Sequence, residues 1–323
     1  MEDDGVAPAA GTPAIRTEAL TKSYGERRGV FDLALEVRQG EVYGFLGPNG
    51  AGKSTTIRLL LDLIRPQRGR AWVLGLEARR DAVAIHRQVG YLPGELALEP
   101  RLTARQLLTY FANLRGGVDW RYVGTLASAL DLDLDRRFGD YSRGNKQKVG
   151  LVQAFMSRPR VLILDEPTSG LDPLNQETVY AFVRAAREEG RTVFFSSHIL
   201  SEVEGLCDRV GFIREGRLVQ VGPVHALVGM RSYEVVAECA APPPAGLLDG
   251  VAGVSQGRIE GTTVRCTVQG EMNGLLAALL PYHVRRLLSH EPSLSELFMQ
   301  LYEGEGAPPA PAGSAGRTPT VVK

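Results

Sequence analysis

Short apolar runs alternate with segments of helical spacing over the first two thirds of the chain. Residues 42–46, 161–164 and 193–195 are runs of this kind, and an uninterrupted run of that length is typical of a strand buried on both faces of a parallel sheet. Residues 54–64 follow the first run with apolar positions at helical spacing. The alternation predicts an α/β fold in which helices flank a parallel sheet.

Polar residues at two places predict where further helices begin. Thr103 precedes Gln106 by three residues, and Ser293 precedes Glu296 by the same distance. This spacing is that of a capping box, in which each side chain bonds to the backbone N–H group of the other residue. We therefore expect one helix to start at Thr103 and a last helix to run from Ser293 through Leu301.

The character of the chain changes near Arg231. Residues 233–237 and 263–268 resemble strands, and a Pro-rich turn at residues 241–246 lies between them. Both ends of the chain are rich in Ala, Gly and Pro, a composition typical of disorder. We therefore divide the chain into a disordered lead at residues 1–13, an α/β domain at 14–230, a small α+β domain at 231–304 and a disordered tail at 305–323.

Composition narrows the class of protein. The chain has 323 residues, of which 44% are apolar and 23% charged, as in a globular protein. Its formal net charge of +0 offers no basic field to a nucleic acid, so we expect no nucleic-acid partner. Cys207, Cys239 and Cys266 lack the spacing of a metal site, and we interpret them as reduced thiols of a cytosolic protein.

The hydrophobic runs are all too short for a membrane helix, which needs about 20 consecutive apolar residues. The N-terminus is acidic and lacks the hydrophobic region of a signal peptide. We therefore expect any transport role to require a separate membrane protein.

One segment fits the phosphate-loop pattern G-x-x-x-x-G-K-[ST] in full, between a predicted strand and a predicted helix. Its residues are Gly47, Pro48, Asn49, Gly50, Ala51, Gly52, Lys53 and Ser54. In this context backbone N–H groups and the helix N-terminus face phosphates, Lys53 reaches the β- and γ-phosphates, and the Ser54 hydroxyl ligates Mg²⁺. An ordinary Gly-rich turn would explain the glycines but neither Lys53 nor Ser54.

Two acids, Asp165 and Glu166, end the apolar run at residues 161–164. The carboxyl ends of strands in an open α/β sheet face the ligand crevice. Asp165 is therefore placed to hold Mg²⁺, directly or through water, and Glu166 to orient or deprotonate an attacking water. A solvated turn before Pro167 is the alternative, which the phosphate loop upstream disfavours.

The order of motifs resembles that of ABC ATPases from about residue 15 to residue 229. Residues 20–25 resemble the A-loop, 141–147 the signature motif, 165–173 the second nucleotide motif with the D-loop, and 196–198 the switch-histidine motif. The resemblance implies a P-loop NTPase domain of the ABC type with a helical subdomain. It also implies ATP as the nucleotide and Mg²⁺ as its metal.

The resemblance implies roles for single residues on the chain's own nucleotide. Tyr24 would stack on the adenine, Thr55 would join the nucleotide site, and His198 would bond the γ-phosphate and the attacking water. A tyrosine that only caps a strand and a solvated surface histidine are the alternatives for Tyr24 and His198.

Three further residues are implied to complete a nucleotide site. Ser142 and Gly144 would form an anion site for the γ-phosphate held by the opposite subunit, at a helix N-terminus. Asp172, in the D-loop, is assigned to the nucleotide site as well. An ordinary N-cap and first helical turn is the alternative for Ser142 and Gly144.

Two segments depart from the family's pattern. Residues 141–145 read Tyr-Ser-Arg-Gly-Asn where the family has Leu-Ser-Gly-Gly-Gln. Gly94 stands where the family has a glutamine that touches Mg²⁺, and Glu95 follows it. Glu95 or a water would have to take the place of that glutamine.

Residues 291–298, near the end of the second domain, and residues 91–96 resemble the drug- and antibiotic-export branch of the family. In that branch the permease is a separate polytopic membrane chain, and two ATPase subunits meet head to tail. We therefore expect a cytoplasmic ATP-hydrolysing subunit that is peripheral on the cell membrane through its permease. A non-hydrolysing regulatory subunit of a heterodimer and a non-transport ABC ATPase are the two alternatives.

Overall fold

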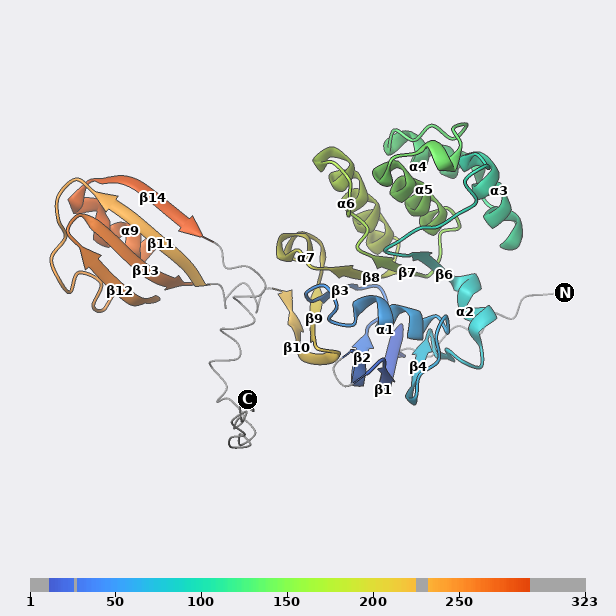
Figure 1. The fold of residues 1–323 in the computed structure, drawn as a ribbon, viewed down its shortest axis with the longest axis horizontal. Coiled ribbons are helices and arrows are strands. Elements are labelled where there is room, and N and C mark those ends of the chain that lie inside the picture. Colours follow the sequence, from blue (N-terminus) through green and yellow to red (C-terminus); the bar gives the residue numbers. More distant parts are fainter. Residues whose placement is uncertain (1–11, 26–27, 225–231, 291–323) are drawn as a thin grey trace, which may run out of the picture. The chain divides into compact units, whose positions relative to one another are not determined.

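The computed structural model describes residues 12–25, 28–224 and 232–290. The chain divides into two compact units, Met1–Met230 and Arg231–Lys323, which are considered separately (Figure 1). Within the described residues, no helix has both the length and the apolar character needed to cross a membrane.

Several predictions for the two ends of the chain lie outside the described residues. These are the disordered lead apart from Thr12 and Pro13, the disordered tail at residues 305–323, and the capping box of Ser293 and Glu296 with the helix that follows it.

A six-stranded sheet forms the centre of the first unit, in the order β10-β9-β3-β8-β7-β6. Its five strands from β9 to β6 run parallel, and β10 pairs antiparallel with β9 at one edge. The strands are β3 (Val42–Leu46), β6 (Val89–Leu92), β7 (Val161–Asp165), β8 (Thr192–Ser197), β9 (Arg209–Arg214) and β10 (Arg217–Pro223). The predicted parallel α/β sheet is confirmed, and the three predicted strands β3, β7 and β8 are buried at every residue.

A second, antiparallel sheet was not predicted. Its order is β2-β1-β4-β5, with β1 (Ile15–Ser23), β2 (Gly29–Val37), β4 (Arg68–Val73) and β5 (Leu76–Glu77). The pairing of β1 with β2 shifts register on both sides of Leu20, and Ala19 has a left-handed φ of 45°. These irregularities break the alternation of apolar and polar residues from which a strand is recognised in sequence.

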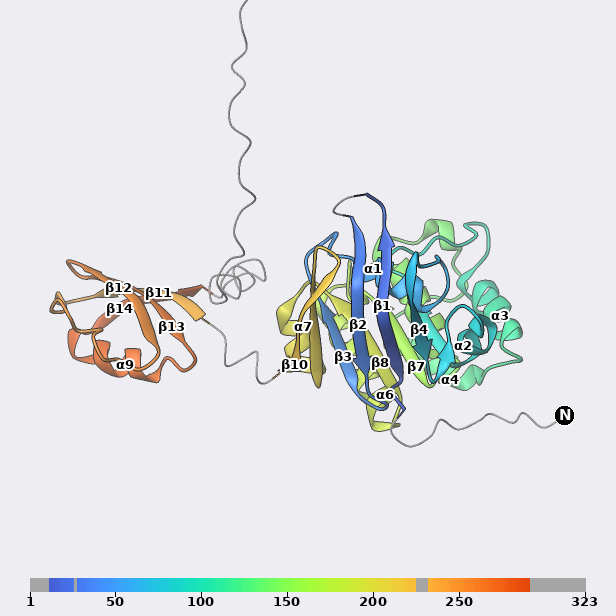
Figure 2. The same ribbon diagram turned by 90° about the horizontal axis from the view of Figure 1, so that it is seen from below.

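Helix α1 (Lys53–Leu60) lies between the two sheets and contacts β2, β4 and β7 (Figure 2). Its Ile57, Leu59 and Leu60 are buried in the core that both sheets share. The helix is shorter than the predicted span of residues 54–64, because Asp62 adopts a left-handed φ of 50° that a helix cannot continue. The loop before α1 is thus joined directly to a helix that is packed into this shared core.

The remaining helices of the first unit flank the parallel sheet. They are α2 (Ala82–Gln88), α3 (Ala104–Leu114), α4 (Trp120–Ala129), the 3-10 helix η1 (Phe138–Asp140), α5 (Arg143–Phe155), α6 (Pro173–Glu188) and α7 (Leu200–Leu206). Helix α5 contacts both α3 and α4, and Figure 1 shows the three gathered into a helical group. The predicted capping box at α3 is confirmed, since Thr103 Oγ1 accepts from Gln106 N at 3.2 Å and Gln106 Oε1 from Thr103 N at 2.9 Å.

The second unit is a four-stranded antiparallel sheet in the order β12-β13-β11-β14 with one helix. Its elements are β11 (Ser232–Cys239), β12 (Val254–Glu260), β13 (Thr263–Gln269), α9 (Asn273–Leu279), the 3-10 helix η2 (Leu280–Tyr282) and β14 (Val284–His290). The two predicted strands fall within β11 and β13, which pair directly, with Tyr233 opposite Val268. Its core includes Val235, Cys266 and Leu275, separate from the core of the first unit.

Because each unit encloses its own apolar core, we predict that a chain ending at Met230 folds by itself. All residues that the sequence assigns to the nucleotide precede Met230, so the shortened chain should also bind Mg-ATP with an affinity near that of the parent. Circular dichroism with thermal unfolding, followed by ATP titration, would check both points. A folded truncation that had lost ATP binding would contradict the prediction.

Candidate functional site

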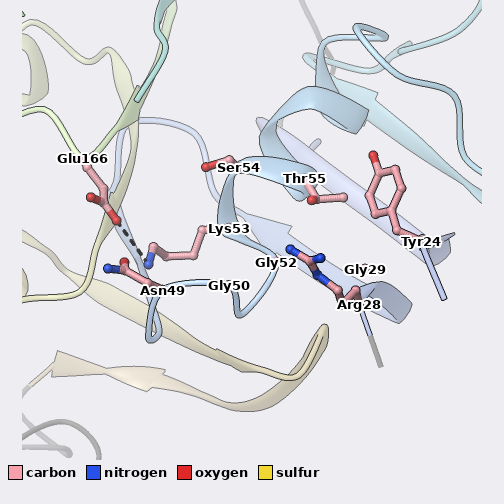
Figure 3. A pocket seen from close by; sticks show the side chains of 10 residues that line it. All are labelled: Tyr24, Arg28, Gly29, Asn49, Gly50, Gly52, Lys53, Ser54, Thr55 and Glu166. Atoms are coloured by element: carbon pink, nitrogen blue, oxygen red, sulfur yellow. Dashed lines mark ion pairs between the residues drawn. The ribbon is translucent and has the colours of Figure 1, made fainter. Parts of the chain in front are cut away.

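A cavity of about 470 Å³ opens beside the phosphate loop, within the size range of small-ligand sites. It is lined by Tyr24, Arg28, Gly29, Asn49, Gly50, Gly52, Lys53, Ser54, Thr55 and Glu166. Figure 3 shows Tyr24 at one end of this lining and Glu166 at the other, with the phosphate loop between them. An elongated ligand with an aromatic ring at one end and anionic groups at the other fits this arrangement.

The phosphate loop needs its glycines for both conformation and space. Gly50 and Gly52 have left-handed φ values of 81° and 113°, which favour glycine. A Cβ atom at Gly47 would lie 2.3 Å from Ile213 O, and one at Gly52 would lie 2.9 Å from the Gly29 carbonyl oxygen. The loop is thus pressed against neighbouring backbone, and its N–H groups precede helix α1 as the sequence predicts.

Lys53 is the first residue of α1, and its side chain is only 5% exposed. Its ammonium group donates to the carbonyl oxygens of Gly47 at 2.6 Å and Pro48 at 3.3 Å. It also lies 3.3 Å from Glu166 Oε1, the contact drawn in Figure 3. Among the described residues, the partners of this buried ammonium group are carbonyl oxygens and one acid, so it is well placed to meet an anionic ligand.

Glu166 lies where β7 ends, and its oxygen Oε1 is shared by two partners. Besides Lys53, His198 Nδ1 lies 3.3 Å from it. Glu166 has a left-handed φ of 49°, uncommon for a residue with a side chain. Its N–H group donates to Ser196 O at 3.2 Å and Ser196 Oγ at 3.1 Å, which holds this turn in place. The structure therefore brings together Lys53, Glu166 and His198, which the sequence assigned to the γ-phosphate and the attacking water.

Asp165 is 2% exposed at the end of β7. Its Oδ1 accepts a hydrogen bond from Ser196 Oγ at 2.6 Å. Its Oδ2 faces Gly94, where a Cβ atom would lie 3.2 Å away. One carboxylate oxygen is thus fixed by Ser196, and the other lies beside a residue without a side chain.

The departure at Gly94 therefore places a residue without a side chain close against Asp165. Glu95 lines a different cavity, an apolar groove of about 790 Å³ that also includes Pro93, Leu96 and Phe111. Tyr91 lines this groove as well, and its burial, followed by the nearby charge of Asp165, raises the pKa of Tyr91 to about 12. The groove thus comes close to the strand end that carries Asp165.

The signature segment caps helix α5. Ser142 is its N-cap and accepts from Asn145 N at 3.3 Å. A Cβ atom at Gly144 would lie 2.6 Å from Gly170 O, so the helix start packs on the turn that leads to Asp172. Asp172 caps α6 and accepts from Asn175, whose hydrogen bonds hold the pKa of that carboxyl below its usual range.

Ser142, Gly144 and Asp172 do not line the cavity beside the phosphate loop. This placement agrees with the resemblance, which assigns Ser142 and Gly144 to the nucleotide of a second subunit. The ordinary capping that the sequence left as an alternative is also present, because Ser142 and Asp172 both serve as N-caps. Their roles towards a nucleotide stay predictions.

Several residues near the site had no role assigned from sequence. Gln147 Nε2 donates to Glu166 O and Pro167 O, both at 3.2 Å, which ties the signature helix to the acidic turn. Arg143 Nη2 donates to Ser169 Oγ at 3.2 Å, so this departure from the family's glycine links the same two segments.

Arg28 and Gly29 line the cavity, and Ser196 holds Asp165 and Glu166. Arg28 and Gly29 carry no spacing signal, because only the fold brings the start of β2 to the phosphate loop. Ser196 lies in the motif at residues 196–198, to which the sequence assigned a role only through His198.

The chain also matches known proteins in sequence. Residues 30–169 match the family model described as ABC transporter. The bacitracin transport ATP-binding protein of Bacillus licheniformis is 40% identical over 216 residues, which are 66% of this chain and 71% of that protein. The Nod factor export ATP-binding protein I of Burkholderia orbicola is 34% identical over 296 residues, covering 87% of this chain and 94% of that protein.

A third relative covers both units. The daunorubicin resistance ATP-binding protein of Streptomyces coeruleorubidus is 35% identical over 308 residues, covering 89% of this chain and 94% of that protein. Among solved structures, an ATP-binding subunit of an ABC transporter is 30% identical with a TM-score of 0.62, covering 66% of this chain and 91% of that one. The chain therefore belongs to the ATP-binding subunits of ABC transporters.

Proposed function

We propose that this chain hydrolyses ATP and that hydrolysis drives export through a separate membrane permease. The observation that carries the proposal is the meeting of Lys53 and His198 at one oxygen of Glu166, beside a complete phosphate loop. Relatives named for bacitracin transport, Nod factor export and daunorubicin resistance support export as the direction of transport. The cargo that we propose is a drug, an antibiotic or a lipid-like compound.

The lining of the cavity offers partners for each part of ATP. The half-exposed ring of Tyr24 offers a stacking face for adenine. The N–H groups of the phosphate loop and the N-terminus of α1 bind the phosphates, and Lys53 meets the β- and γ-phosphates. When the γ-phosphate arrives, it competes with Glu166 for the ammonium group of Lys53, which leaves the carboxylate free for water.

The oxygen donors beside the phosphate loop suit Mg²⁺, a hard cation that favours hydroxyl, carboxylate and water ligands. Ser54 and Asp165 would hold it, since Asp165 has one oxygen fixed by Ser196 and a second that lies beside Gly94, a residue without a side chain. When bound, the metal neutralises charge on the phosphate oxygens. Gly94 stands where the family has a glutamine, and Glu95 lines the apolar groove rather than the cavity beside the phosphate loop. In this proposal a water therefore takes the place of the glutamine side chain.

Hydrolysis needs one proton acceptor and one orienting group. Glu166 accepts a proton from water as the water oxygen attacks the γ-phosphorus. The bond from the γ-phosphorus to the bridging oxygen breaks, which yields ADP and inorganic phosphate. His198 donates to the γ-phosphate and holds the water in line with the leaving group. It can reach this water because its Nδ1 lies 3.3 Å from the carboxylate of Glu166.

A second copy of an ATPase subunit completes the site. Ser142 and Gly144, at the N-terminus of the 13-residue helix α5, would bind the γ-phosphate held by the opposite subunit. Asp172 would lie at the same interface, next to the turn on which Gly144 packs. In this arrangement ATP joins the two subunits, and its hydrolysis separates them.

We place the chain on the cytoplasmic face of the membrane, held there by its permease. The permease would dock in the apolar groove between the parallel sheet and the helical group. The groove exposes the side chains of Leu63, Val83 and Leu114, which are 52%, 70% and 65% accessible. Exposed apolar side chains gathered in one hollow mark a surface that a partner covers. A permease segment bound in this groove would contact Tyr91 and Pro93, which line it. Tyr91 lies near enough to Asp165 to feel its charge.

Replacing Lys53 tests the phosphate site. Lys53→Ala removes the ammonium group that faces the phosphates, so the affinity for Mg-ATP should fall at least about tenfold, the size of one charge-assisted hydrogen bond. Arg80→Ala is the control, because it removes a positive charge that is 82% exposed and away from the cavity. Titration with a fluorescent ATP analogue would check both variants, and parent-like binding by Lys53→Ala would refute the phosphate site.

Replacing Glu166 tests the chemistry. Glu166→Gln keeps the shape of the side chain but removes the proton acceptor, so ATP should bind while turnover falls at least about 10²-fold. Uncleaved ATP should then hold a stable dimer, visible by size-exclusion chromatography with Mg-ATP. Glu95→Gln is the matched control and should keep the parent turnover. A parent chain that binds ATP but releases no phosphate would favour the regulatory alternative.

Replacing one exposed leucine tests the docking groove. Leu114→Asp places a charge on the apolar lining without disturbing the core, so the chain should leave the membrane fraction of its native host. Val219→Asp changes an exposed apolar side chain on β10, outside the groove, and should remain bound to membranes. Equal membrane-bound fractions for Leu114→Asp and the parent would contradict docking at this groove.

A further inference from the structure

A buried carboxylate lies behind the candidate site without any part in the chemistry described so far. Glu202, on α7, is 6% exposed. Thr168 Oγ1 donates to its Oε1, Ser197 Oγ donates to its Oε2, and Tyr180 OH donates to Oε1 at 3.3 Å. Glu202 is therefore bound by three hydroxyl groups that come from three different segments.

These contacts are directional. A buried carboxylate is costly unless hydrogen-bond donors surround it, and an ionised carboxylate can only accept. The hydroxyl protons of Thr168 and Ser197 must therefore both point at Glu202. Ser197 Oγ in turn accepts from Ile199 N at 2.9 Å, so its own orientation is fixed from both sides.

Two of the three hydroxyl groups belong to segments that build the hydrolytic site. Thr168 opens the turn after Glu166, and its carbonyl oxygen accepts from Leu171 N at 3.1 Å, one residue before Asp172. Ser197 directly precedes His198, and its carbonyl oxygen accepts from Gly47 N of the phosphate loop at 3.3 Å. The third hydroxyl, that of Tyr180, belongs to α6.

We propose that Glu202 is a positioning residue for ATP hydrolysis, which ties the His198 segment to the turn between Glu166 and Asp172. The two oxygens of this carboxylate each bind one segment, Oε1 through Thr168 and Oε2 through Ser197. Glu202 thereby sets the distance between His198 and the acidic turn. The inference rests on the proposed function, since it concerns how the hydrolytic groups are held in register.

Replacement by glutamine tests this positioning without changing the size of the side chain. In Glu202→Gln one oxygen becomes an NH₂ group, which donates and cannot accept, so the hydroxyl of Ser197 or of Thr168 can no longer donate to it and must turn to accept instead. We expect the kcat for ATP to fall about tenfold or more, because small displacements of positioned groups lower rates by up to about 10²-fold. The dissociation constant for Mg-ATP should stay within about twofold of that of the parent, because Glu202 does not line the cavity.

The same contacts can be removed from the hydroxyl side without burying a new group. Ser197→Ala and Thr168→Val should each lower kcat in the same way, and combining either with Glu202→Gln should add little, as expected for residues that act as one unit. Tyr180→Phe is the matched control. It removes a hydroxyl from the same carboxylate but frees neither site segment, so its kcat should stay within about twofold.

Amide hydrogen exchange of the nucleotide-free chain gives a readout that does not depend on turnover. In Glu202→Gln, the amides of Ile199 and Leu171 should exchange faster than in the parent, while those of the second unit should not change. Parent-like exchange together with parent-like kcat in Glu202→Gln would overturn the inference. An equal loss of kcat in Tyr180→Phe would overturn it too, because the network would then act only through stability. Failure of the proposed function would instead appear as a parent chain without turnover, and the exchange measurement would still decide the role of Glu202.

Discussion

The buried ammonium group of Lys53 is the constraint on which the site depends. It is 5% exposed and is held by two carbonyl oxygens of its own loop and by Glu166. A buried positive charge needs a negative partner. In this structure that partner is Glu166, the residue proposed to accept the proton of the attacking water. In the proposed mechanism, binding of a γ-phosphate would release Glu166 from Lys53, so that occupancy of the site and activation of water would be one exchange of partners.

The scaffold keeps this exchange within a narrow geometry. Helix α1 is packed between two sheets, so the phosphate loop before it has little freedom. Ser196 fixes both acids at the end of β7, and Gln147 ties the signature helix to the backbone of the same turn. The segment that would face a second subunit is thus connected to the segment that would activate water. In the proposed mechanism, opening or closing of a dimer would move the two acids through this connection.

The sequence predicted those parts of the structure that rest on local patterns. The buried strands β3, β7 and β8, the capping box at Thr103 and the phosphate loop each have a signature within a few residues. The antiparallel sheet was missed because bulges around Leu20 break its alternation.

Contacts between distant segments had no sequence signal. Arg28 reaches the cavity, and Glu202 binds hydroxyl groups from three segments, only because of the fold. The most direct test of the central claim is the structure of the Glu166→Gln chain with Mg-ATP. The proposed mechanism predicts a head-to-tail dimer in which each γ-phosphate contacts Lys53 of one subunit and the Ser142 helix of the other. A nucleotide whose phosphates lie away from Lys53, or bind without a second subunit at the Ser142 helix, would contradict it.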